Sequence, residues 1–176
     1  MSYEIFAEGT LTGTATSVDL TAIPQTAIHL ELYFNSRSNK ADASHRGGGV
    51  RFNNISSNNY GMGGNYGESS TTAAVWNRTM NSRDWVDDAI RHWNNSATAA
   101  LFAPSKMVIP NYTSTTIGSK GLIIQNSVWG EDTSTYWIMQ AMGDCTTSSA
   151  ITQITIYPES GSSFVAGTSY YLAGWE

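Results

Sequence analysis

Short runs of alternating apolar and polar residues dominate this chain. In Ala27–Phe34, the side chains of Leu30, Leu32 and Phe34 point to one side of an extended backbone, and the more polar residues between them point to the other. The run Ala150–Tyr157 alternates in a similar way, although both of its faces carry apolar residues. A period of two is typical of a strand in a sheet, so both runs are predicted to be β-strands.

Further segments are rich in Val, Ile, Tyr, Trp and Thr and are bounded by Gly, Asn and Ser, a pattern typical of strands and turns. We therefore expect an all-β chain of about eight or nine strands. The glycine-rich stretches Gly47–Gly49 and Asn58–Gly67 are predicted to be surface loops. The further strand candidates are Thr14–Leu20, Gly49–Asn53, Thr72–Asn77, Met107–Tyr112, Leu122–Gln125, Thr135–Met139, Phe164–Ala166 and Tyr170–Trp175.

One segment has a helical pattern instead. Ser82 is a suitable N-cap for a short helix over Arg83–Trp93, in which Trp85, Ala89 and Trp93 would stack at positions i, i+4 and i+8. Such a stripe usually covers a hydrophobic core. The alternative is a contact with another chain.

Composition limits the function classes. The chain has 176 residues, which suits one domain, and only 13% of them are charged, with a net charge of −5. The sequence has no cluster of basic residues, so we do not expect it to bind nucleic acid. It also has no run of about 18 apolar residues and no signal peptide, so we expect no membrane association. The single cysteine, Cys145, excludes an intramolecular disulfide and is expected to be a small, partly buried side chain.

The sequence offers little for catalysis. The histidines lie at positions 29, 45 and 92, and His92 follows Asp88 by four residues, which on a helix would make a surface pair. The adjacent carboxylates Asp87 and Asp88, and Glu131 and Asp132, would point apart, and no catalytic or metal-binding motif is present. We expect no enzyme activity, no cofactor and no metal.

Abundant hydroxyls, amides and aromatic rings suit either recognition of a sugar or a rigid contact with a neighbouring subunit. Several aromatic residues lie in or beside predicted turns, and two lie on the predicted helix. The candidate contacts with a partner or glycan are Tyr60, Tyr66, Trp85, Trp93, Trp129 and Trp175.

A set of short motifs follows one another along most of the chain: Ile23–Thr26, His29–Leu32, Asn35–Ser38, Val50–Asn54, Asn59-Tyr60, Asn111-Tyr112 with Lys120, Ala150–Ile154, Phe164–Thr168 and Tyr171–Trp175. Their order and spacing resemble those of a group of small domains in the virion proteins of tailed bacteriophages. The resemblance implies an antiparallel β-sandwich of jelly-roll type, commonly trimeric, on the outside of phage heads or in tail and head fibres.

The resemblance begins near residue 23, so we expect residues 1–22 to form an N-terminal arm or edge strand and residues 23–176 the sandwich. Because the module fills the chain and no fibre shaft precedes it, we expect a homotrimeric capsid decoration or cement protein. It would be made and assembled in the host cytoplasm and bind the major capsid protein on the surface of the virion. The alternative is a receptor-binding domain of a tail or head fibre that recognises host glycans. A depolymerase acting on surface sugars is the third and weakest hypothesis.

Overall fold

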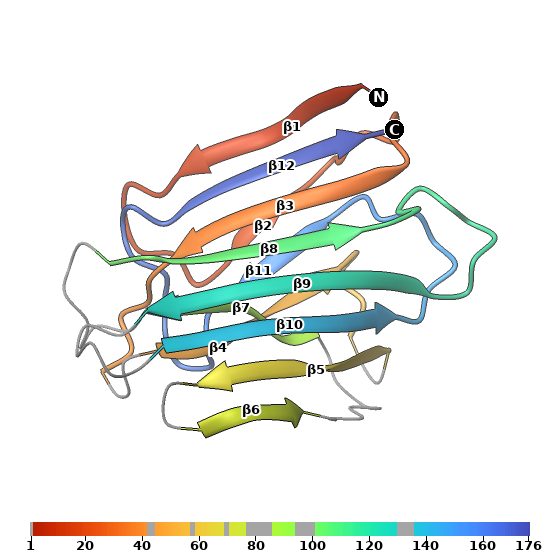
Figure 1. The fold of residues 1–176 in the computed structure, drawn as a ribbon. Helices are drawn as coiled ribbons and strands as arrows, with labels where there is room; N and C mark the ends of the chain where they lie inside the picture. Colours follow the sequence, from red (N-terminus) through yellow and green to blue (C-terminus); the bar gives the residue numbers. More distant parts are fainter. Residues whose placement is uncertain are drawn as a thin grey trace.

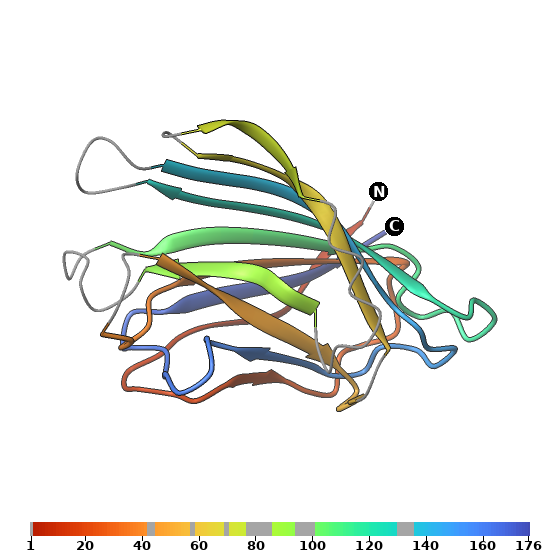
Figure 2. The same cartoon turned by 90° about the horizontal axis from the view of Figure 1, so that it is seen from below.

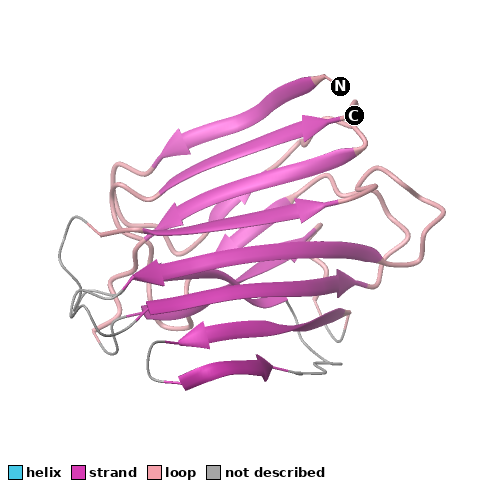
Figure 3. Ribbon diagram, viewed as in Figure 1, coloured by secondary structure: helices cyan, strands magenta, loops and turns pink. Residues whose placement is uncertain are grey.

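The protein is an antiparallel β-sandwich of two unequal sheets (Figure 1). Its computed structural model describes residues 2–41, 45–56, 59–68, 71–76, 86–93, 101–129 and 136–176. Within these ranges the regular structure consists of strands, with no helix (Figure 3). This confirms the expected all-β sandwich.

The larger sheet has eight strands. In spatial order they are β1 (Tyr3–Thr10), β12 (Ser169–Trp175), β3 (His29–Ser36), β8 (Ala103–Ile109), β9 (Lys120–Trp129), β10 (Tyr136–Cys145), β5 (Tyr60–Glu68) and β6 (Thr71–Trp76). The smaller sheet has four strands and covers one face of the larger one, as the view from below shows (Figure 2). Its order is β2 (Val18–Leu20), β11 (Ile154–Tyr157), β4 (His45–Phe52) and β7 (Val86–Trp93).

The core lies between the two sheets and follows the alternation of the sequence. On β3 the predicted inward residues Leu30, Leu32 and Phe34 are buried, and Tyr33 between them is exposed. The strand predicted over Ala150–Tyr157 is shorter, since only β11 belongs to the sheet, and Ile154 and Ile156 are buried within it. The segment Phe164–Ala166 forms only isolated bridges at Phe164 and no strand.

The predicted helix over Arg83–Trp93 is wrong, because Val86–Trp93 is strand β7 at the edge of the smaller sheet. Ser82 and Trp85 lie outside the described residues. The side chains of Ile90, His92 and Trp93 are all buried. A strand covered on both faces loses its period of two, so its sequence resembles that of a buried helix.

Both predicted glycine-rich loops are also wrong over most of their length. Gly47–Gly49 lies inside β4, and most of the second stretch forms β5. A Cβ atom at Gly48 would approach the Tyr157 carbonyl oxygen to 2.3 Å, and one at Gly64 would approach the Ala141 Cα to 2.6 Å. Glycine here allows close approach of neighbouring backbones rather than a turn.

Of the two alternatives for the N-terminal residues, an arm or an edge strand, the structure has an edge strand. β1 pairs with β12 from Tyr3 opposite Trp175 to Thr10 opposite Ser169. A bulge between Ile5 and Ala7 interrupts the pairing. The two ends of the described chain therefore lie side by side (Figure 1).

Candidate binding site

The aromatic residues selected from the sequence do not form a shared surface. Tyr60 and Trp93 are buried in the core, so neither ring is accessible to a binding partner. Tyr66 is half-buried and stacks on Trp137, with ring centroids 4.3 Å apart. Trp175 is half-buried, and its ring centroid lies 4.2 Å from that of His29.

The remaining two candidates lie outside the described side chains. Trp85 is not among the described residues, and Trp129 is the last residue of β9, with a side chain that is not described.

The Trp137 ring, which stacks on Tyr66, also lies under the guanidinium of Arg91, whose Cζ is 4.5 Å from the ring centroid. This stack connects β10 of the larger sheet with β7 of the smaller one.

The motif residues meet at one end of the sandwich, where they connect turns to each other. The Asn53 backbone has a φ of 49°, in the left-handed region that Asn tolerates. Its Oδ1 accepts hydrogen bonds from the backbone nitrogens of Thr152 at 2.9 Å and Gln153 at 3.1 Å. Its Nδ2 donates to the Ala150 carbonyl oxygen at 2.7 Å. Two motifs far apart in sequence are thus joined by one side chain.

Tyr60 and Gln25 act in the same way. The Tyr60 hydroxyl accepts a hydrogen bond from the Phe52 backbone nitrogen at 2.9 Å and donates to the Ile55 carbonyl oxygen at 3.1 Å. The Gln25 Nε2 donates to the carbonyl oxygen of Ile151 at 3.0 Å. These motif residues therefore hold turns together, which explains them as parts of the fold and not as ligand contacts.

Behind this end lies a buried group of titratable side chains. Cys145 is a free, fully buried thiol, and it pairs across the sheet with Lys120 on one side and Tyr60 on the other. Burial raises the pKa of the thiol to about 11 and lowers the pKa of Lys120. The Lys120 ammonium donates to the Ser114 carbonyl oxygen. A thiol held protonated is a poor nucleophile.

Among the described residues, the histidines and carboxylates do not come together as a site. His92 is fully buried, and on strand β7 it lies about 13 Å along the chain from Asp88, too far for the predicted pair. Glu131 and Asp132 lie outside the described residues. In the described ranges, no three His, Cys, Asp or Glu side chains come together as metal ligands. The same ranges contain no helix long and apolar enough to cross a membrane.

The structure does present one broad open surface, the face of the larger sheet that points away from the smaller sheet. We call it the outer face. Its side chains lie in rows across the strands, because register pairs neighbouring residues: Tyr171 with Tyr33, Tyr33 with Lys106, Lys106 with Gln125, and Gln125 with Gln140. We call this set the tyrosine–amide row.

Two more rows flank it. On one side lies an apolar row of Val108, Ile123 and Met142, in which Ile123 is 48% and Met142 is 71% exposed. On the other side Asn35 pairs with Pro104, and Ser127 pairs with the exposed Ile138. The charged side chains in these rows are Lys106 and Glu31, which pairs with Val108 and lies 3.0 Å from the Lys106 ammonium, and the other side chains named are uncharged.

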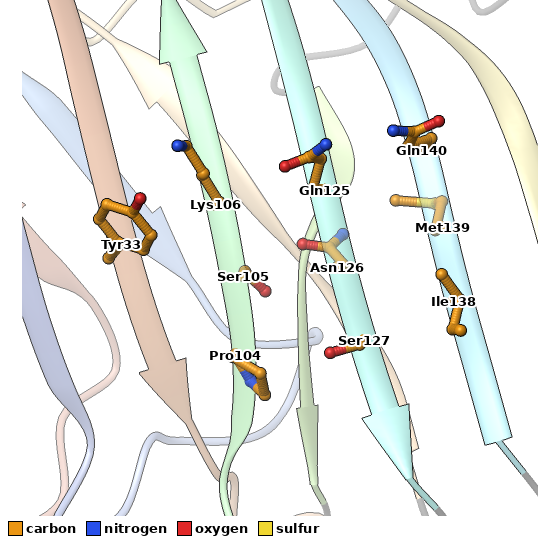
Figure 4. Close-up of a pocket in the computed structure, with 10 residues that line it drawn as sticks. All are labelled: Tyr33, Pro104, Ser105, Lys106, Gln125, Asn126, Ser127, Ile138, Met139 and Gln140. Atoms are coloured by element: carbon orange, nitrogen blue, oxygen red, sulfur yellow. The ribbon is translucent and has the colours of Figure 1, made fainter.

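A furrow runs between the tyrosine–amide row and the row of Asn35, Pro104, Ser127 and Ile138. Figure 4 shows the part of it that is lined by β3, β8, β9 and β10. One part, over β3, β8, β9 and β10, has a volume of about 410 Å³. A second part of about 190 Å³ continues it over β12 and shares the lining residues Tyr33, Pro104 and Ser105. The floor is backbone, because the intervening residues such as Asn126 and Met139 are turned into the core.

Tyr33 and Lys106 are fixed in the middle of this furrow. The Lys106 Nζ lies 3.0 Å from the Glu31 carboxylate and 5.0 Å from the centroid of the Tyr33 ring. Hydrogen bonding to Tyr33 and to Glu31 raises the pKa of Lys106, so its ammonium stays charged near neutral pH. Because Glu31 neutralises this charge, the furrow carries no strong field for an anion.

The sequence analysis selects none of the residues that line the furrow as candidate contacts. Only the strand pattern points to one of them. The outward positions of β3 could be inferred from alternation, and Tyr33 is one of them. The alignment of Gln125 and Gln140 with Tyr33 depends on the register of four strands, which alternation alone does not give.

No family model matches the sequence of this chain, and no curated protein matches it significantly.

Proposed function

We propose that this protein is a capsid decoration or cement protein of a tailed bacteriophage. It would be a homotrimer of jelly-roll sandwiches, made in the host cytoplasm and bound to the major capsid protein on the outside of the assembled head. The observation that carries the proposal is the broad, mostly uncharged outer face of the larger sheet, over which no described segment packs. The motif order supports the assignment to a virion.

The apolar row gives this face its adhesive character. Ile123 and Met142 lie side by side on neighbouring strands and are largely exposed, with Val108 beside them. Contiguous exposed apolar residues mark surfaces that bind other proteins. Burial of such residues against the shell would persist at high salt, whereas exposed ion pairs are screened.

A cement role needs no chemical step. A trimer that spans a junction between capsid proteins makes linked contacts, which can exceed a single contact by about 10² to 10⁴ in effective affinity. Because the protein would bind the assembled shell and not its free subunits, it would stabilise the shell by mass action.

Binding of purified protein to phage heads that lack it tests the proposal. We expect Ile123→Glu and Met142→Glu to abolish binding, because each would bury a charge at the contact. Ile117→Glu is the matched control, since Ile117 is an exposed isoleucine outside this sheet. Equal binding by all three variants, each with an unchanged melting temperature, would contradict the use of this face.

The location and copy number of the protein test the assignment to the head. We expect hundreds of copies per particle, and heads without the protein should break at lower temperature than complete heads. A handful of copies confined to the tail, or equally resistant heads, would contradict the assignment.

The furrow favours a second candidate function, receptor binding by a tail or head fibre. A lined groove of this kind is not needed for adhesion to a shell. If this function is correct, the purified protein should compete with phage for adsorption to host cells. Unchanged adsorption at saturating protein would contradict it.

A further inference from the structure

The furrow has the shape of a site for an elongated ligand. Its lining comes from β12, β3, β8, β9 and β10, which are successive strands of the sheet. Neighbouring strands lie about 4.8 Å apart, so the furrow extends about 19 Å across them. This length suits a short chain molecule rather than a single small metabolite.

The two walls differ in chemistry. The amides of Gln125 and Gln140 each offer two N–H donors and a carbonyl acceptor from one wall (Figure 4). The opposite wall presents the apolar side chains of Pro104 and Ile138 with the Ser127 hydroxyl between their strands. A sugar has the matching character, because each ring carries hydroxyls at its edge and C–H groups on its faces.

Tyr33 supplies an aromatic surface between the two parts of the furrow. Its side chain is 42% exposed and lines both parts. The ring is held in place by Lys106 on one strand and by Tyr171 on the other, with the two tyrosine ring centroids 6.3 Å apart. The face of an aromatic ring is electron-rich and attracts polarised C–H groups.

Other elongated ligands fit less well. A nucleic acid or an acidic polysaccharide needs unpaired positive charge, and Lys106 is already paired with Glu31. An extended peptide usually adds to a sheet edge, where backbone groups are free. The floor of the furrow is the hydrogen-bonded backbone of central strands, so it offers no such groups.

We propose that the furrow binds a neutral oligosaccharide, laid across the strands, with a sugar ring stacked on Tyr33 and hydroxyls hydrogen-bonded by Gln125 and Gln140. This inference goes beyond a cement role and names the site that the receptor-binding alternative would use. It holds whether the protein sits on the head or on a fibre.

A glycan array followed by calorimetry on the retained compounds tests it. The probes are neutral glucan, mannan and galactan oligosaccharides beside sialylated and sulfated ones. We expect neutral oligosaccharides to be retained. Tyr33→Ala and the double variant Gln125→Ala, Gln140→Ala should each weaken binding about tenfold or more, since each removes about 1.4 kcal/mol or more.

A matched control for the two glutamines lies on the same face without lining the furrow. Asn65→Ala removes the exposed amide next to Gln140 on β5. This variant should bind within about twofold of the unaltered protein. Retention of no neutral glycan, retention of anionic glycans alone, or equal binding by Tyr33→Ala would overturn the proposal.

The result is separable from the test of head binding. Ile123→Glu and Met142→Glu should abolish attachment to heads and leave glycan binding intact, because neither residue lines the furrow. Glycan binding without head attachment, or the reverse, identifies which proposal fails.

Discussion

The side-chain oxygen of Asn53 accepts a hydrogen bond from the backbone nitrogen of Thr152 at 2.9 Å, across 99 residues of sequence. The same atom accepts a second backbone hydrogen bond from Gln153. One side chain thus joins the end of β4 to the start of β11, its neighbour in the smaller sheet.

Loss of this side chain should destabilise the fold. We expect Asn53→Gly, which keeps the left-handed backbone accessible, to lower the free energy of unfolding by about 1 to 3 kcal/mol, because the hydrogen bonds from this side chain to the backbone of residues 150, 152 and 153 are lost. Urea denaturation measures the change. Asn54→Gly is the matched control, because Asn54 has a φ of 55° and its Nδ2 donates to a side-chain oxygen, the Oε1 of Gln153, whereas Asn53 bonds the backbone of another segment. A cost for Asn54→Gly as large as that for Asn53→Gly would contradict this role.

Substitution of two adjacent glycines, Gly63 and Gly64, tests whether this stretch is strand β5 packed against β10. A Cβ at Gly64 would lie 2.6 Å from the Ala141 Cα, whereas a Cβ at Gly63 would meet nothing within 4 Å. We expect Gly64→Ala to cost about 1 to 3 kcal/mol through overpacking, and Gly63→Ala to be neutral or slightly stabilising. Thermal unfolding of the two variants compares them directly. Equal tolerance would mean that this stretch is a loop after all.

Removal of the Tyr60 hydroxyl should also be costly. In Tyr60→Phe the Phe52 N–H would lose its partner at a buried position, so we expect a loss of about 1 to 3 kcal/mol. Tyr33→Phe serves as the control, since its hydroxyl lies on the exposed outer face. Urea denaturation should show almost no change for this control. If both variants are equally stable, the Tyr60 hydroxyl does not support the turn.

Alkaline pH should weaken the fold through Cys145. Burial raises the pKa of this thiol from 9.0 to about 11, so between these values the unfolded chain releases a proton that the folded chain keeps. The stabilisation is therefore complete below about pH 9 and is lost as pH rises toward about 11, at a cost of up to about 2 to 3 kcal/mol. Burial raises the pKa of Tyr60 as well and adds to the loss above about pH 10.

Urea unfolding at a series of pH values measures this effect. We expect the slope of stability against pH between about pH 9 and pH 10 to be shallower in Cys145→Ala than in the unaltered protein. The variant is also expected to be less stable at neutral pH, because it removes a buried sulfur. Identical slopes in the two proteins would show that the thiol is not responsible.

Strands with one solvent-exposed face can be predicted from the sequence, and strands that are buried on both faces cannot. β3 shows a clear alternation, with Leu32 buried and Tyr33 exposed. β7 buries Ile90, His92 and Trp93 alike, so its sequence has no period of two and predicts a helix. The glycines of β5 predict a loop, because their contact with the Ala141 backbone is visible only in the folded sheet.

The candidate site, like the strands, could be predicted from the sequence only in part. Aromatic residues near predicted turns or on the predicted helix are candidate contacts in the sequence, yet Tyr60 holds a turn from inside the core and Trp93 is buried. Alternation identifies Tyr33 only as an outward residue of a strand. No sequence signal connects it with Gln125 or Gln140, which come from strands about 90 and 105 residues away along the chain.

The sequence by itself determined that this chain is a single β-sandwich with low charge, because local alternation and turn residues act over a few positions and are written along the chain. Only the tertiary structure decided which strands are neighbours and in which register. Register is set by the burial of one face against the other sheet and by the turns that join the strands, so it depends on contacts between residues far apart in sequence. The furrow exists only once that register aligns Tyr33, Lys106, Gln125 and Gln140 in one row.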